Sequence, residues 1–321
     1  MFFMRPLLRI VPDHTHIAFM RGRYLGLLGS AILSTASITL FFYPGLNLGI
    51  DFAGGIVMEA ITPAPADFNK LRAALTAQGV QASGVQRFGD ADTVAVRLGA
   101  QPTEAANQIV VSKVRAALEQ AQPGTRVVRT DAVGASVSSE LFRAGMLALG
   151  LSMLMILVYI WFRFEWEFAV GAVVTLILDI TKAIGFLALT RLQFDLVMIG
   201  ALLTILGYST NDKVVVYDRM RENLRKYKTM PLRELIDLSI NETLARTLGT
   251  SMTVFLAALP LALYGGSTLS GFAWVMLFGI VVGTSSSIFI AAPILLLLGE
   301  HRLRRDAGSM AKAAKASKAP A

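Results

Sequence analysis

The sequence predicts an α-helical polytopic membrane protein with one small soluble α+β domain inserted after its first helix. Of the 321 residues, 54% are hydrophobic and only 16% are charged, and the mean hydropathy is +0.58. Soluble domains carry about a quarter charged residues, so this composition excludes an ordinary water-soluble chain. Six apolar runs match the roughly 20 residues that a membrane-spanning helix needs. One long polar stretch separates the first run from the second and forms the α+β domain.

Each apolar run is expected to be helical, because hydrocarbon offers backbone groups no hydrogen-bond partner outside their own segment. Arg21 and Arg23 precede the first run, as basic residues precede the core of a signal peptide. The apolar core of a signal peptide is only about 7 to 15 residues long, shorter than this run, so we expect an uncleaved span. The predicted spans are Tyr24–Tyr43, Ala144–Phe162, Phe168–Thr190, Phe194–Tyr217, Thr247–Tyr264 and Phe272–Leu298.

Lys and Arg are concentrated in three segments, 1–23, 218–246 and 299–321, which the six spans place on one side of the membrane. An excess of these residues marks the cytoplasmic side, so we expect both termini in the cytoplasm of a bacterial inner membrane. This topology accounts for the net charge of +8, and no nucleic-acid partner is needed. The tail 299–321 is rich in Ala, Lys and Ser and is predicted to be disordered.

The predicted extracytoplasmic domain covers residues 44–143. Its pattern gives strands at 56–61, 82–88, 93–98 and 126–132, with helices at 67–78 and 103–121. The order β-α-β-β-α-β is that of a ferredoxin-like sandwich. No nucleophile or metal cluster stands out in this stretch, and the chain has no cysteine for a disulfide or thiolate site. We expect a binding or docking module.

Ionisable residues inside the spans are the candidate functional groups, because each costs a few kcal/mol in a membrane and usually lines a pathway or has a partner. The third span carries Asp179 and Lys182, which lie three residues apart on one helical face. Two interpretations stay open for them. They form a neutral structural ion pair, or Asp179 serves as a second carboxylate beside the pathway.

Asp212 in the fourth span is the stronger candidate. Thr204, Tyr208 and Asp212 recur at four-residue intervals and predict a polar stripe, beside Asn211 and Lys213. The fifth span opens at Arg246, and antiparallel neighbours joined by a short segment bring Arg246 and Asp212 to similar depth. A change in the distance between a carboxylate and a guanidinium loads or releases a proton, so we predict that this pair relays protons.

Three alternatives remain open around this pair. Arg246 could instead extend to the membrane surface as an interfacial residue. Lys213 either extends to the cytoplasmic edge or competes as the partner of Asp212. Gly279, Gly283 and Ser287 recur at four-residue spacing in the sixth span and predict close helix packing without a chemical role.

Four motifs then resemble the SecF family of protein-export membrane proteins, over nearly the whole chain. LGIDFAGG at 48–55 is similar to the family's LGxDFxGG signature, with Gly49, Asp51, Phe52, Gly54 and Gly55 at the matching positions. RFEW at 163–166 resembles the loop between the second and third spans. GYSTNDKVVVYDRMREN at 207–223 resembles GYSxNDTVVVxDRxREN, and RTLGTS at 246–251 resembles RTxxTS. The matching charged residues of the second and third motifs are Arg163, Glu165, Asp218 and Arg219.

The resemblance implies a six-helix half of the resistance-nodulation-division (RND) fold. It implies association with SecD beside the SecYEG channel, with YajC and YidC as further partners, and promotion of preprotein translocation by the proton-motive force. No cofactor is implied. The family's proton-relay carboxylate falls on Asp212 and its arginine on Arg246. Two departures affect this region: Lys213 stands where the family commonly has Thr, and Leu178 where it often has His.

Two other functions compete with this hypothesis. One is an RND-type half-transporter that exports a lipid or small molecule, against which the single modest domain and the missing second repeat argue. The other is an assembly scaffold for SecD and the channel that moves no protons. We expect no enzyme, since His14, His16 and His301 lie at the membrane margins and the sequence has no phosphate-binding loop.

Overall fold

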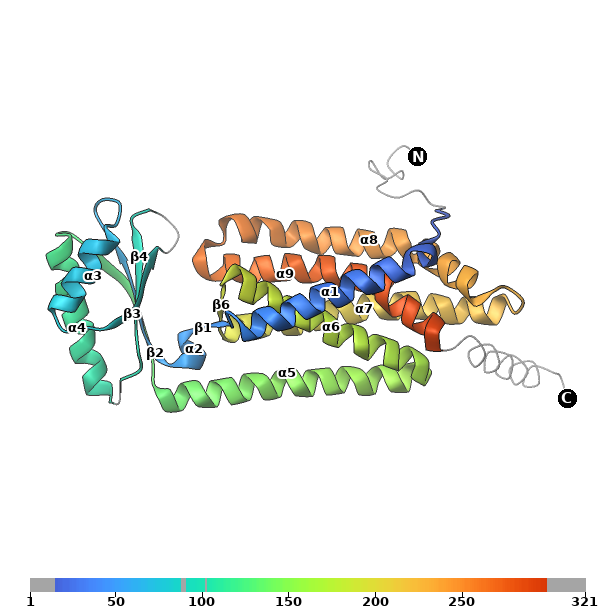
Figure 1. Ribbon diagram of the computed structural model, residues 1–321, viewed down its shortest axis with the longest axis horizontal. Helices are drawn as coiled ribbons and strands as arrows, with labels where there is room; N and C mark the ends of the chain where they lie inside the picture. Colours follow the sequence, from blue (N-terminus) through green and yellow to red (C-terminus); the bar gives the residue numbers. More distant parts are fainter. Residues whose placement is uncertain (1–14, 88–90, 102, 299–321) are drawn as a thin grey trace, which may run out of the picture.

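The structure, a computed structural model, describes residues 15–87, 91–101 and 103–298. It consists of a helix bundle with a small sheet domain at one end (Figure 1). The tail 299–321, which we predicted to be disordered, lies outside the described residues, as does most of the segment 1–23. We call the end of the bundle away from the sheet domain the distal end.

Six long helices form the bundle. After a short 3₁₀ turn at Phe19–Gly22 they are α1 (Arg23–Phe42), α5 (Ala135–Arg163), α6 (Trp166–Thr190), α7 (Leu196–Lys226), α8 (Leu232–Tyr264) and α9 (Gly266–Ser286), which continues through a π-helical turn at Ser287–Ala291.

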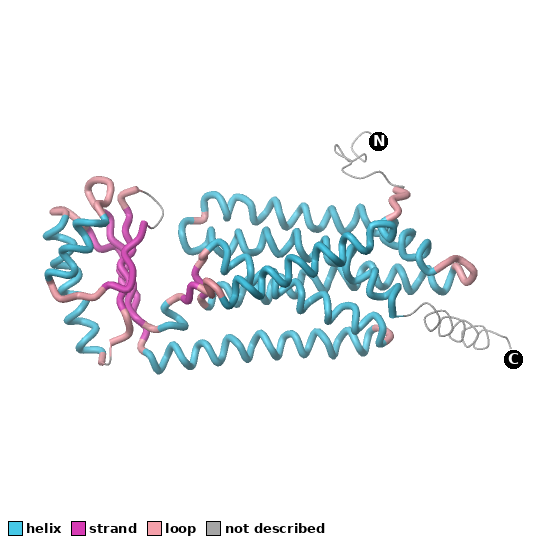
Figure 2. Tube along the Cα trace, in the orientation of Figure 1, coloured by secondary structure: helices cyan, strands magenta, loops and turns pink. Residues whose placement is uncertain are grey.

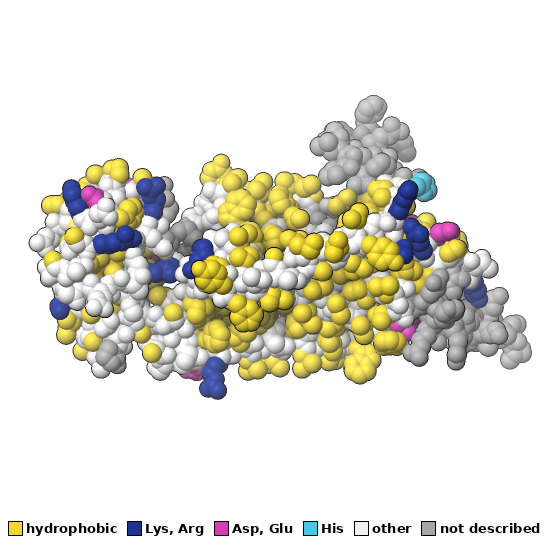
Figure 3. Space-filling view, viewed as in Figure 1, with side chains coloured by type: hydrophobic (Ala, Val, Ile, Leu, Met, Phe, Trp, Pro, Cys, Tyr) yellow, Lys and Arg dark blue, Asp and Glu magenta, His cyan; other side chains and the backbone are white. Residues whose placement is uncertain are grey.

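Within the described residues, five helical stretches are long and apolar enough to cross a membrane: 19–42, 135–163, 166–190, 232–264 and 269–298. Helix α7, which carries Asn211, Asp212 and Lys213, is not among them. On the face that Figure 3 shows, hydrophobic side chains nevertheless cover the middle of the bundle, with Lys and Arg gathered toward its ends.

The segment 218–246, predicted as the connection between the fourth and fifth spans, is mostly helical. Helix α7 continues to Lys226 and α8 begins at Leu232. The physical reason lies in a pattern that we did not read as helical: Leu235, Ile236 and Ile240 recur at helical spacing and are buried. Helix α5 likewise begins at Ala135, well before the predicted start of the second span, and carries the chain from the sheet domain into the bundle.

The sheet domain contains four strands and two helices close to the predicted positions. They are β2 (Gly55–Ile61), α3 (Phe68–Ala77), β3 (Ala82–Arg87), β4 (Thr93–Leu98), α4 (Glu104–Ala121) and β5 (Arg126–Val133). The sheet order is β3-β4-β2-β5, and every neighbouring pair is antiparallel. Figure 2 shows the strands gathered beside α3 and α4, at one end of the molecule.

One face of the sheet is covered and the other faces the bundle. Helices α3 and α4 lie on the side away from the bundle (Figure 1), where Ile56 and Met58 of β2 form a core with Leu71 and Leu118. Alternating burial along β2 fits this arrangement, since successive side chains of a strand point to opposite faces. The uncovered face is therefore available to line a cleft at the end of the bundle.

The junction between the two parts is built from the 48–55 motif. Strand β1 (Asn47–Leu48) pairs in parallel with β6 (Gln193–Phe194), and α2 (Ile50–Ala53) follows. Gly55 has φ +127°, and a Cβ there would collide with the carbonyl oxygen of Leu98. Only glycine fits this approach of strand β2 to strand β4.

Candidate functional site

The bundle buries four adjacent charged residues at its centre. Asp179 and Lys182 on α6, and Asp212 and Lys213 on α7, are each at most 4% exposed. Charged side chains are rarely this buried unless they are paired, because removal from water costs several kcal/mol per ion. The formal charges of the two aspartates and the two lysines sum to zero. Which aspartate pairs with which lysine decides what the site can do.

Lys213 pairs with Asp179, a partner that neither of the two alternatives considered for Lys213 included. The Lys213 Nζ lies 3.0 Å from Asp179 Oδ2, while Lys182 Nζ lies 3.9 Å from Asp179 Oδ1. Ser209 and Ser286 each donate a hydrogen bond of 2.7 Å to the same Asp179 oxygen. Lys213 also donates to both serine hydroxyls. Because Lys213 is completely buried, it does not extend to the membrane edge, and it holds α6, α7 and α9 together.

Asp212 points to a different set of partners, which we call the hydroxyl chain: Tyr208, Ser251 and Thr284. Tyr208 donates to Ser251 Oγ at 2.7 Å, Ser251 lies 2.7 Å from Thr284 Oγ1, and Thr284 donates to Asp212 Oδ2 at 3.4 Å. The chain joins α7, α8 and α9 and ends on the carboxylate. Hydroxyl groups both donate and accept, so such a chain can conduct a proton.

Arg246 does not pair with Asp212 in this structure. Its side chain is exposed, and among the described residues no ion pair within 4.0 Å includes it. The face of α8 that meets the hydroxyl chain is formed instead by Thr247 and Ser251, and consecutive helical residues point about 100° apart. Thr250 and Thr253, which follow Arg246 along α8, donate to carbonyls of their own helix.

The remaining predicted stripe residues are only partly involved. Tyr208 belongs to the hydroxyl chain, but Thr204 is exposed and bonds the Gly200 carbonyl, and Asn211 is exposed. Sequence reasoning missed three hydroxyl residues that contact the buried charges, and also Ser251, which contacts Thr284 within the hydroxyl chain. Two sequence patterns could have indicated them: a hydroxyl residue about one helical turn from a charged residue, and a run of hydroxyl residues in the last helix. The four residues are Ser209, Ser251, Thr284 and Ser286.

The predicted small-residue face of the last helix is confirmed. A Cβ at Gly279 would collide with the side chain of Ile205, and one at Gly283 would approach Ser209 within 3.2 Å. Ser287 is buried and donates to the Gly283 carbonyl. This close contact of α9 with α7 places Thr284 and Ser286 next to the charged residues.

The motifs at 163–166 and 207–223 meet at the distal end. Arg163 donates to both oxygens of Asp218, at 2.7 and 2.9 Å, and Arg221 lies 3.7 Å from Glu165. Arg219 binds Glu222 at 2.6 Å and Glu242 of α8 at 2.7 Å. These pairs fix the α5–α6 turn and the start of α8 against the end of α7.

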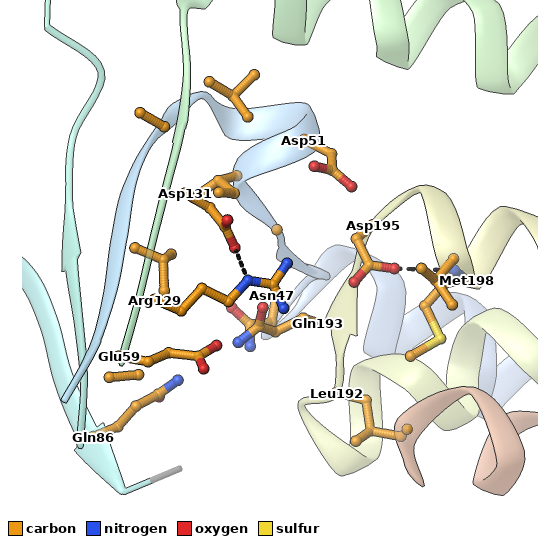
Figure 4. A pocket seen from close by; sticks show the side chains of 18 of the residues that line it. Asn47, Asp51, Glu59, Gln86, Arg129, Asp131, Leu192, Gln193, Asp195 and Met198 are labelled. Atoms are coloured by element: carbon orange, nitrogen blue, oxygen red, sulfur yellow. Dashed lines mark hydrogen bonds and ion pairs between the residues drawn. The ribbon is translucent and has the colours of Figure 1, made fainter. Parts of the chain in front are cut away.

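A polar cleft of about 750 Å³ separates the uncovered sheet face from the bundle (Figure 4). Arg129 of β5 binds Asp131 at 2.7 Å and points toward Asn47 and Gln193 at the end of the bundle. Burial raises the pKa of Glu59 on the same face; Arg129 acts against this shift and Asp131 adds to it. The cleft thus carries mixed charge where the two parts of the molecule face each other.

The fold and the buried charges define a multi-pass helical membrane protein in which ionisable groups and hydroxyls connect the central helices. Residues 113–301 match the family described as protein export membrane protein SecD/SecF, C-terminal, and residues 40–60 match the SecD/SecF GG motif. The chain belongs to the SecD/SecF family.

Relatives and solved structures agree with this assignment. The protein translocase subunit SecF of Cereibacter sphaeroides is 40% identical, over 92% of this chain and 93% of that protein. The subunit SecDF of Brucella abortus is 42% identical over 94% of this chain, but over only 40% of its own length. The crystal structure of SecDF from Thermus thermophilus, a translocon-associated membrane protein, has a TM-score of 0.81 at 31% identity, covering 92% of this chain and 40% of that one. SecDF in its super-membrane-facing form has a TM-score of 0.62.

Proposed function

We propose that this chain is the SecF-type half of a SecD–SecF complex that promotes preprotein translocation through SecYEG and draws on the proton-motive force. The relatives named SecF support the assignment, and relatives named SecDF carry a matching segment within a longer chain. SecD is therefore the first partner, and SecYEG, YajC and YidC follow from the family resemblance. The single observation that carries a proton-driven role is the buried Asp212 at the end of the hydroxyl chain.

The proposed topology places the protein in the bacterial inner membrane with six spans. One of them is α7, whose charged residues keep it out of the five helices that are apolar enough by composition. Both termini lie in the cytoplasm and the sheet domain lies outside it. The order β3-β4-β2-β5, with two helices on one face, supports a ferredoxin-like extracytoplasmic domain. In this orientation the cleft of Figure 4 opens where a translocating polypeptide leaves the membrane.

The proposed mechanism uses Asp212 as the site that binds and releases protons. Tyr208, Ser251 and Thr284 connect it through three helices, while Lys213 is held by Asp179 and balances charge nearby. Arg246 sits on α8 without an acidic partner within 4.0 Å among the described residues. A shift of α8 along α7 that brings the guanidinium toward Asp212 would favour the charged carboxylate and release a proton. The protein needs no cofactor and acts as no enzyme in this scheme.

The test is proton-gradient-dependent release of a translocating protein from vesicles that contain SecD and this chain. Asp212→Asn and Arg246→Met are each expected to lower the gradient-dependent part of export by at least about ten-fold. Binding to SecD should be unchanged. Normal export by Asp212→Asn would support a non-transducing scaffold instead, and transport of a lipid or small molecule without any preprotein would support an exporter.

A further inference from the structure

The distal end carries a concave, basic cleft of about 390 Å³ that the relay does not use. It is lined by Arg163, Asp218, Arg221, Glu222, Arg225 and Lys226. Four of these six side chains are cationic. Both carboxylates are already engaged, Asp218 by the two hydrogen bonds from Arg163 and Glu222 by Arg219 from outside the cleft.

Two arginines of this cleft, Arg163 and Arg221, are held in place by neighbouring groups. Arg221 donates to the Arg163 carbonyl at 3.3 Å and is positioned by Glu165. Its Nε is buried without a hydrogen-bond partner among the described residues. A guanidinium fixed in this way is suited to a phosphate, because phosphate oxygens accept parallel hydrogen bonds from its planar donors.

The position of the cleft indicates where such a phosphate comes from. The turn between α5 and α6 exposes Trp161, Phe162 and Trp166 beside Arg163, and Phe162 is 90% exposed. Exposed aromatic residues at the ends of spans mark the depth of the lipid headgroups. The cleft therefore lies at headgroup level, within reach of a lipid whose acyl chains run along the apolar surface of α5 and α6.

We propose that this cleft binds the phosphate of an anionic phospholipid. The two motifs at 163–166 and 207–223 then have a joint purpose: their mutual ion pairs build the cleft, and Arg221, Arg225 and Lys226 supply the charge that recognises the headgroup. The inference goes beyond the proposed export function, since it needs neither SecD nor a proton gradient.

The experiment measures binding of fluorescent phosphatidylglycerol to the purified full-length chain in detergent. Arg225→Gln with Lys226→Gln removes two cleft charges at exposed positions. Lys228→Gln with Arg233→Gln is the matched control, since both residues are exposed, basic and outside the cleft. Each charge near an anionic surface is worth about five-fold in binding, so the cleft variant, which lacks two charges, should bind about 25-fold more weakly. The control should change less than about two-fold.

Competition identifies the source of the phosphate. Unlabelled phosphatidylglycerol should displace the probe, whereas phosphatidylcholine and inorganic phosphate should not at the same concentration. Equal weakening in the two double variants would show general attraction to anionic lipid and would overturn the proposal. Displacement by inorganic phosphate as effective as by phosphatidylglycerol would also overturn it, because the site would then take soluble phosphate. Gradient-driven export by the cleft variant is measured separately, so the outcome of the lipid-binding test does not depend on the outcome of the Asp212 test.

Discussion

Asp212 and Lys213 are neighbours in sequence, yet they serve separate polar groups. Lys213 turns toward Asp179, Ser209 and Ser286, and Asp212 turns toward Thr284. The physical cause is the rotation of about 100° between consecutive helical residues, which directs each toward a different helix contact. Lys213 therefore does not pair with the adjacent Asp212, because it is paired with Asp179 of α6.

The Lys213–Asp179 pair should be tested by a double-mutant cycle. Lys213→Met leaves Asp179 buried with only Lys182 at 3.9 Å, and we expect a loss of about 3–5 kcal/mol in stability. Asp179→Leu added to Lys213→Met removes both partners and leaves Lys182 as the buried charge without its carboxylate, so the double variant should lose less stability than the sum of the two single losses. Unfolding in detergent, followed by circular dichroism, measures both. Purely additive losses would contradict the pairing.

The hydroxyl chain gives a second prediction at this scale. Tyr208→Phe removes the donor to Ser251 with little change in shape. A lost hydrogen bond of about 1 kcal/mol predicts a roughly five-fold slower gradient-driven export. Thr204→Val is the control, because Thr204 lies one turn away on the same helix and bonds only its own backbone. Export that falls equally in both variants would show an effect on α7 rather than on the chain of hydroxyls.

At the scale of helices, the contact between α7 and α9 positions both polar groups. Gly279 and Gly283 let α9 approach Ile205 and Ser209 of α7, and Thr284 and Ser286 follow directly on α9. In a membrane, lipid is as apolar as the helices, so the hydrophobic effect does not drive helices together. Close van der Waals contact stabilises their packing instead. The small residues thus have an indirect part in the site.

Gly279→Ala should show this dependence. The added methyl collides with Ile205, and overpacking costs about 1–3 kcal/mol. Ile205→Ala in the same chain should restore stability. Gly200→Ala is the control, since a Cβ there meets nothing within 4 Å. Melting temperatures of the purified proteins measure the effect, and a stable Gly279→Ala protein without the rescue change would refute the close contact.

At the scale of the whole molecule, the sheet domain and the bundle face each other across a cleft and are joined by short elements. The β1–β6 pair is only two residues long, and Asp51 accepts a hydrogen bond from the Leu196 amide at 3.2 Å. The sheet domain has its own separate hydrophobic core. Helix α5 also connects the two parts, but each part has its own core, so a change in the angle between them would leave both cores intact.

A cross-link across the cleft tests whether export requires such a change. The chain has no cysteine, so Arg129→Cys with Gln193→Cys introduces one pair on opposite sides of the cleft. A cleavable bismaleimide should stop gradient-driven export, and cleavage should restore it. Each single-cysteine protein, treated in the same way, controls for modification alone. Full export by the cross-linked protein would exclude a role for relative movement.

The apolar runs and the strand pattern were predictable because both depend on local periodicity. Helices α1 and α6 and the four strands of the sheet lie within a few residues of their predicted bounds. The helical start of α8 was not predicted, because many of its residues are polar. The structure shows that Leu235 and Ile236 of this segment are buried. Asp212 was selected correctly as a buried carboxylate, because charge within a long apolar run stands out from sequence alone.

The sequence by itself determined which segments are helices or strands, which family the chain resembles, and which charges lie inside the bundle. Only the tertiary structure decided that Lys213 binds Asp179, that Ser251 rather than Arg246 lies in the hydroxyl chain that reaches Asp212, and that two distant motifs build one basic cleft. Hydrophobic periodicity fixes the secondary structure of a segment from its own residues. The rotation of each helix against its neighbours depends on packing among all of them, so side-chain partners follow from the assembled fold.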